Sequence, residues 1–98
     1  MKREDFIFTI GYQGDTALVD GSGKRQYGRL STRELAEHGL LKPALCSAVF
    51  SGDEAEVQTV LEIYRKMSGS STMTAEQLKR TLGVFSISDS SITKVKVL

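Results

Sequence analysis

The middle of the chain carries apolar residues at helical spacing, with charged and polar residues between them. One run follows the i, i+3, i+4, i+7 pattern of an amphipathic helix: Val57, Val60, Leu61 and Tyr64. Acidic residues begin this segment and basic residues end it, which is the order that the helix dipole favours. The pattern predicts a helix over residues 53–67 with one buried face.

Two shorter helices are predicted just before it. Ser31 and Glu34 have the spacing of a reciprocal cap, which predicts a helix over residues 32–38. Gly39 follows and suits the left-handed conformation that ends many helices. Pro43 suits the first turn of the next helix, which runs to Phe50 and is apolar on all sides. Because such a helix has no face for water, we expect it to be the most buried element.

A fourth helix is predicted over residues 74–83. Thr74 and Gln77 again have the spacing of a reciprocal cap, and Gly83 is placed to end the helix. The small polar residues 68–72 separate this helix from the previous one.

Alternation of apolar and polar residues predicts strands near both ends of the chain. Residues 6–10 and 16–19 are expected to form an N-terminal hairpin around a turn at 11–15. A second turn at Asp20 to Gly23 is expected to lead into a short third strand over 24–28. Residues 84–88 and 92–98 are expected to form a C-terminal hairpin.

The order of strands, helices and strands predicts an α+β fold. We expect an N-terminal β-hairpin, three to four short central helices and a C-terminal β-hairpin, with a small, mostly antiparallel sheet packed on the helices. A length of 98 residues, 40% hydrophobic and 26% charged, predicts a single compact domain over residues 1–98.

Several features favour a cytoplasmic protein. No apolar run approaches the roughly 20 residues that span a bilayer, so no membrane partner is expected. The polar start and the short apolar segment 6–10 do not resemble a signal peptide. A single cysteine, Cys46, cannot form an internal disulfide, which agrees with a reducing compartment.

The net charge is only +1, but it is unevenly distributed. Residues 1–33 carry +2, residues 34–64 carry −5 and residues 65–98 carry +4. Two basic clusters are candidate partner-binding patches: Lys24, Arg25, Arg29 and Arg33, and then Lys79, Arg80, Lys94 and Lys96. The first cluster follows a glycine-containing turn that resembles part of a phosphate loop. The match fails, because Leu18 and Arg25 stand where that loop needs glycine and Ser or Thr.

No catalytic, metal or cofactor site is predicted, and we do not expect an enzyme. Cys46 lies in the apolar helix, where a thiol is usually an inert core group. His38 lies at a helix C-terminus, where it suits a structural role. No further His, Cys or paired carboxylates complete a metal site.

Residues 32–50 resemble a bacterial helix-turn-helix in Glu34-Leu35-Ala36, the following Gly39 and the later Leu45. Gly39 arrives one residue earlier than that pattern usually has it. The second helix presents mainly Ala, Leu and Val, and Ser47 is its one good donor to a base edge. The other possible nucleic-acid-binding arrangement is a winged helix over residues 74–98. The fourth helix would contact the bases, and the hairpin would be the wing.

The sequence therefore predicts a small cytoplasmic interaction domain that acts through protein contacts or self-association. A homodimer is expected if strand edges stay open in the monomer. The alternative is a winged-helix-like protein that binds nucleic acid through residues 74–98.

Overall fold

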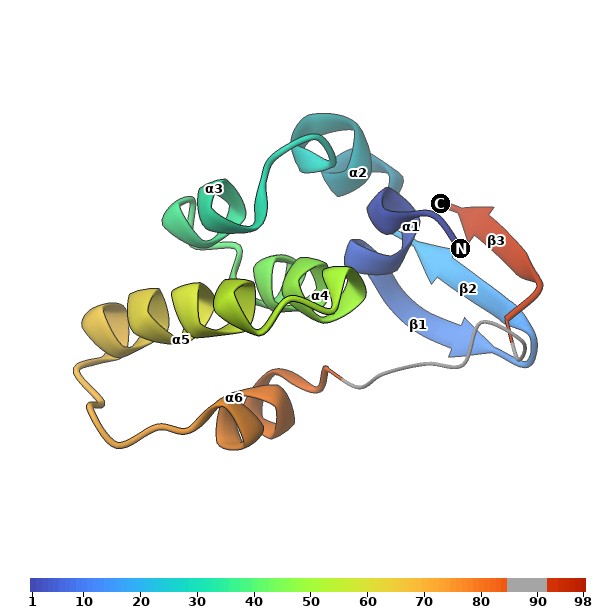
Figure 1. Cartoon of the computed structure of the whole chain (residues 1–98). Helices are drawn as coiled ribbons and strands as arrows, with labels where there is room; N and C mark the ends of the chain where they lie inside the picture. Colours follow the sequence, from blue (N-terminus) through green and yellow to red (C-terminus); the bar gives the residue numbers. More distant parts are fainter. Residues whose placement is uncertain (85–91) are drawn as a thin grey trace. The chain divides into compact units, whose positions relative to one another are not determined.

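The computed structural model describes residues 1–84 and 92–98, which hold six helices and a sheet of three strands (Figure 1). The predicted α+β class is confirmed. The described residues group into two compact units: a sheet unit, residues 1–29 and 92–98, and a helical unit, residues 30–84. The expectation of a single domain over residues 1–98 stays a prediction.

The sheet unit holds two short helices and all three strands: α1 (Arg3–Ile7), β1 (Thr9–Gln13), β2 (Thr16–Val19), α2 (Gly21–Tyr27) and β3 (Lys94–Val97). The strand order is β1-β2-β3. β1 pairs antiparallel with β2, and β3 pairs parallel with β2. The expectation of a mostly antiparallel sheet is therefore wrong, because the C-terminal strand adds to β2 as a parallel neighbour.

The N-terminal segment departs from the predicted strand over residues 6–10. Residues 3–7 form helix α1 instead, and β1 begins at Thr9. Phe6, Ile7 and Phe8 are all buried, so this short apolar run has no outward face. A short apolar run does not distinguish a strand from a buried helix by its periodicity, and here the helix is formed. The second strand covers the predicted Thr16–Val19.

The predicted turn at 20–23 and strand at 24–28 are wrong, because this segment is helix α2. The Asp20 side chain caps the helix by accepting a hydrogen bond from the Gly23 N–H at 3.2 Å. A Cβ at Gly21 would lie 2.5 Å from the Leu98 carbonyl oxygen and 2.9 Å from Val97 Cγ1. A Cβ at Gly23 would lie 2.8 Å from the Phe8 ring. Both glycines thus permit close packing rather than a turn.

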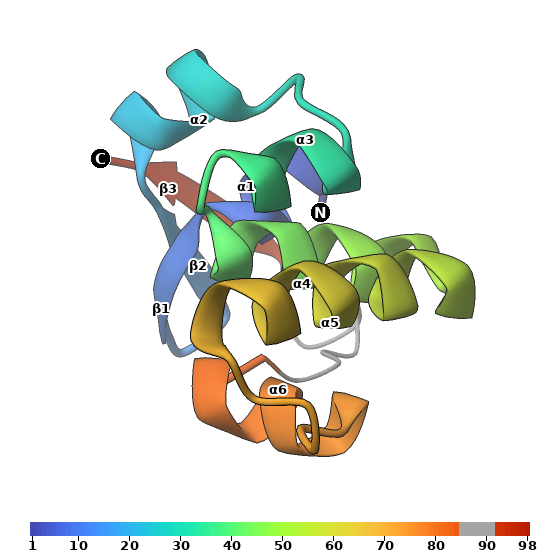
Figure 2. The ribbon, with the colours of Figure 1, turned by 90° about the vertical axis from the view of Figure 1, so that its left-hand side faces the viewer.

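The helical unit contains the predicted helices: α3 (Thr32–Glu37), α4 (Leu41–Ser51), α5 (Glu54–Ser68) and α6 (Ala75–Leu82). Helices α3, α4 and α5 pack on one another (Figure 2). Residues 44–48 of α4 are all buried, as expected for the apolar helix. The largest fully buried side chains of this unit include Leu35, Leu45, Val60 and Leu78.

Helix ends follow the capping rules that the sequence predicted. The capping boxes of Ser31 with Glu34 and of Thr74 with Gln77 are both formed. Hydrogen bonds from the Ser31 backbone and side chain lower the pKa of Glu34. Gly83 ends α6 in the left-handed conformation, with φ of 69°.

The predicted C-terminal hairpin is not confirmed. Its first strand, 84–88, falls mainly outside the described residues. The described strand of that hairpin, β3, pairs with β2. Across residues 1–84 and 92–98, none of the helices has both the length and the hydropathy that a membrane crossing requires.

Candidate functional site

Three of the predicted basic residues lie in or just after helix α2 of the sheet unit. Lys24 and Arg25 are in the last turn of the helix, Gly28 is its C-cap, and Arg29 follows in the turn after it. Together with Glu4 they line an open depression of about 440 Å³. The side chains of Arg25 and Arg29 are exposed, whereas Gly28 is buried. We call Lys24, Arg25 and Arg29 the α2 basic cluster.

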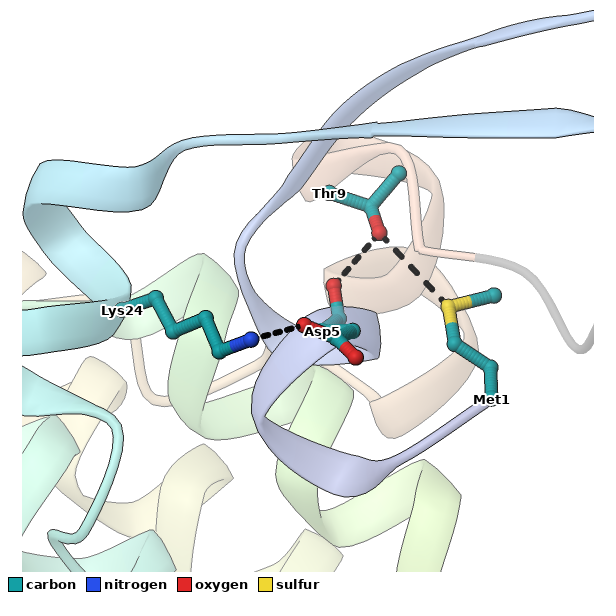
Figure 3. Close-up of polar contacts among 4 residues, drawn as sticks. All are labelled: Met1, Asp5, Thr9 and Lys24. Carbon is teal, nitrogen blue, oxygen red and sulfur yellow. Dashed lines mark hydrogen bonds and ion pairs between the residues drawn. The ribbon is translucent and has the colours of Figure 1, made fainter. Parts of the chain in front are cut away.

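Lys24 is held in place by a buried carboxylate. Its Nζ lies 2.5 Å from Asp5 Oδ1, and Asp5 is only 7% exposed (Figure 3). The Thr9 hydroxyl donates to the Asp5 carbonyl at 2.6 Å and lies 3.8 Å from the Met1 sulfur. Lys24 therefore joins α2 to α1, and part of its charge is neutralised by Asp5.

Arg3 makes a second connection between the N-terminal segment and α2. Its Nη1 donates a hydrogen bond to the Gly28 carbonyl at 2.9 Å, at the end of the helix where carbonyls lack partners within the helix. The wall of the depression is thereby fixed at two points, through Asp5 and through Arg3.

Arg25 and Arg29 supply the charge that remains for a ligand. Neither guanidinium has an ion-pair partner among residues 1–84 and 92–98. A guanidinium presents a planar fork of donors that matches a carboxylate or a phosphate. The arrangement thus suits an acidic group.

The other predicted basic residues are distributed over both units. Arg33 lies on α3 and pairs with Glu37 at 3.6 Å. It does not line the depression. Lys79 pairs with Glu76 at 3.6 Å on α6, where Arg80 is exposed. Lys94 and Lys96 are exposed on β3. The expected winged arrangement therefore has its helix in the helical unit and its described strand in the sheet unit.

Glu4, Asp5 and Gly28 belong to the site although they were not predicted. Glu4 and Asp5 stand just before the predicted strand over residues 6–10. Their proximity to Lys24 depends on α1, which carries both acids in its first turn. Acids in the first turn of a helix are a usable signal, but only once the helix itself is recognised.

Cys46 is a buried core thiol in this structure. It is buried, and burial raises the pKa of the thiol to about 11, although the charge of Lys42 acts in the opposite direction. The reactive thiolate is thus scarce at neutral pH. Within the described part of the chain, no group of three or more His, Cys, Asp or Glu residues is arranged to hold a metal ion.

A polar cluster joins the three packed helices of the helical unit. The Thr32 hydroxyl donates to Glu56 Oε1 at 2.5 Å and lies 2.8 Å from the Ser47 hydroxyl. Thr32 has one hydroxyl proton, and Glu56 receives it, so Ser47 must be the donor to Thr32. Ser47 is only 2% exposed, which removes it as a donor to a DNA base from α4. The cluster links α3, α4 and α5 and has a structural role.

No protein-family model, curated protein or solved structure matches the chain.

Proposed function

We propose that this protein is a small interaction domain that acts through protein contacts, and that the α2 basic cluster recognises acidic side chains of a protein partner. The observation that supports this proposal is the convergence of Lys24, Arg25 and Arg29 around one open depression of about 440 Å³. Two of these three cations have no ion-pair partner among residues 1–84 and 92–98.

The chemistry of the cluster favours a carboxylate-rich protein surface. Arg25 and Arg29 are exposed, so a partner reaches them without entering a deep pocket. Arginine binds carboxylates through two parallel hydrogen bonds, which gives orientation as well as charge attraction. The Lys24–Asp5 pair and the hydrogen bond from Arg3 to the Gly28 carbonyl connect α2 to α1, so the backbone that carries Arg25 and Arg29 is positioned before the partner arrives.

The test is a titration of the protein with a glutamate-rich peptide, followed by NMR amide shifts. The Arg25→Glu/Arg29→Glu variant is expected to bind roughly tenfold more weakly, because two exposed ion pairs of about 0.5–1 kcal/mol each are lost. A matched control is Lys42→Glu/Lys66→Glu, which makes the same charge change at exposed positions of the helical unit. Equal weakening in both variants would contradict the proposal, since it would indicate attraction by net charge alone.

Nucleic-acid binding through residues 74–98 is the competing function. A DNA duplex titrated at two salt concentrations distinguishes it, because phosphate contacts give an affinity that falls steeply with salt. Tight binding that is lost on Lys79→Glu/Arg80→Glu and kept on Arg25→Glu/Arg29→Glu would favour that alternative over a protein partner.

A further inference from the structure

We propose that β3 is the docking edge of the sheet unit, and that it receives an extended acidic segment of a partner protein as an added strand. This inference rests on the proposed function, since it takes the partner to be an acidic protein, and it specifies the partner's conformation and sequence pattern. In the sheet of the described residues β3 is an outer strand, with β2 on one side and no strand on the other (Figure 1).

The hydrogen bonds to β2 identify which backbone groups of β3 face outward. Lys94 N–H donates to the Asp15 carbonyl at 3.2 Å, and Leu98 N–H donates to the Val19 carbonyl at 2.9 Å. Because backbone groups alternate in direction along a strand, Val95 and Val97 direct their N–H and C=O groups away from β2. These outward groups have no partner among residues 1–84 and 92–98. They are the template that an added strand needs.

The side chains of β3 specify the pattern of the added strand. Lys94 and Lys96 lie on one face, and Val95 and Val97 lie on the other. Val95 is 40% exposed and Val97 is 48% exposed. Cross-strand neighbours on one face interact directly, so acidic residues suit the Lys face and apolar residues suit the Val face. The fitting segment therefore alternates acidic and apolar residues.

A second copy of β3 is disfavoured at this edge in the registers that overlap most. With Val95 opposite Val95 of the other copy, Lys94 and Lys96 lie opposite one another, and with Val95 opposite Val97, Lys96 lies opposite Lys96. Like charges directly opposite one another are destabilising. The lysines thus select against β3 of another copy and in favour of an acidic strand.

The α2 basic cluster lies close to the end of the same strand. A Cβ at Gly21 would be 2.9 Å from Val97 Cγ1 and 3.1 Å from Arg25 Nη1, so Arg25 is near the C-terminal end of β3. An acidic segment on the β3 edge that continues past Val97 therefore meets a further guanidinium. Both features belong to the sheet unit, and both favour the same kind of partner.

The first experiment uses a short peptide in which Glu and Val alternate. We expect it to bind the full chain and to shift the amide resonances of Val95 and Val97. Lys94→Glu/Lys96→Glu is expected to weaken binding about tenfold or more, and Lys94→Gln/Lys96→Gln by a smaller factor. Lys42→Glu/Lys66→Glu is the matched control and is expected to bind like the unchanged protein. Equal binding by the unchanged protein and the Lys94→Glu/Lys96→Glu variant would overturn the proposal.

The second experiment separates strand addition from simple charge attraction. Two peptides carry N-methyl groups, one on every Glu nitrogen and the other on every Val nitrogen. The Glu side chains of the added strand lie on the same face as Lys94 and Lys96. A parallel added strand then donates its Glu N–H groups to β3, whereas an antiparallel one donates its Val N–H groups. Strand addition therefore predicts that one methylated peptide loses binding and the other keeps it. Retention of binding by both would overturn the proposal.

A glutamate-rich peptide that contains proline distinguishes failure of this inference from failure of the proposed function. Proline lacks the N–H that a strand needs, so this peptide measures charge recognition without strand addition. If it binds as well as the alternating peptide, the edge proposal is wrong and the proposed function stands. If neither peptide binds, both are wrong.

Discussion

Thr32 is the residue on which the polar cluster of the helical unit depends. It donates to Glu56 and accepts from Ser47, and it is only 4% exposed. Thr32→Val keeps the shape of the side chain but removes both hydrogen bonds, so the unfolding free energy is expected to fall by about 1–3 kcal/mol. Urea unfolding measures this loss. Thr81→Val is the control: its exposed hydroxyl donates only to the Gln77 carbonyl of its own helix, so a change of a few tenths is expected. Equal losses would contradict a special role for the buried cluster.

Cys46 predicts a pH dependence of stability. The pKa of the thiol is 9.0 as the ordinary value and about 11 when buried in the folded chain. Below about pH 9 both states hold the proton, so Cys46 adds no pH dependence there. Between about pH 9 and pH 11 only the unfolded chain loses it, and stability falls by up to roughly 2–3 kcal/mol. We expect urea unfolding of Cys46→Ala to lack this part of the decline. If the unfolding free energies of the two proteins declined equally between about pH 9 and pH 11, the raised pKa of a buried Cys46 thiol would be contradicted.

Helix α2 is one of two helices that were not predicted from the sequence, and its glycines explain why. Gly21 and Gly23 are typical of a turn, and glycine disfavours a helix by about 1 kcal/mol relative to alanine. Here the chain needs both glycines for close contacts, with Leu98 and with Phe8. The Asp20 cap and the Lys24 pair with Asp5 stabilise the helix in compensation. The contacts with Leu98, Phe8 and Asp5 are tertiary and leave no local signal, whereas the Asp20 cap is local, like the caps at Ser31 and Thr74.

Gly21→Ala tests the contact between α2 and β3. Helix propensity alone predicts stabilisation by about 0.5–1 kcal/mol, since Gly21 is a helical residue. A Cβ only 2.5 Å from the Leu98 carbonyl oxygen predicts the opposite, a net loss of about 1–3 kcal/mol. Faster amide exchange at Leu98, whose N–H donates to Val19, is expected with it.

Gly11→Ala is the control for that substitution. A Cβ added at Gly11 meets no atom within 4 Å, so only a small change in the unfolding free energy is expected. Stabilisation by Gly21→Ala would show that β3 moves to accommodate the added Cβ without a loss of stability.

At the scale of the whole chain, the sequence predicted local elements better than long-range pairing. Caps and helical spacing located α3, α4, α5 and α6, because those signals lie within a few residues of one another. The parallel pairing of residues 16–19 with 94–97 depends on contacts between distant segments, and alternation in each strand does not reveal its partner or direction. The candidate site likewise depends on a contact between distant segments that local patterns do not reveal. Lys24, Arg25 and Arg29 were predicted, whereas Asp5 enters through a helix that local patterns did not reveal.

The expected homodimer remains a prediction, and the charge pattern of β3 restricts how it forms. Two unchanged copies that pair antiparallel with Val95 opposite Val95 or Val97 place Lys opposite Lys, so we expect no association in these registers. A Lys94→Glu/Lys96→Glu copy also repels itself, but opposite an unchanged copy, with Val95 opposite Val95, each Glu faces a Lys. Light scattering is therefore expected to show a higher mass for the equimolar mixture than for either protein alone, and high salt is expected to reduce it. A mixture that scatters as the average of its components would mean that the β3 edge does not accept an acidic strand.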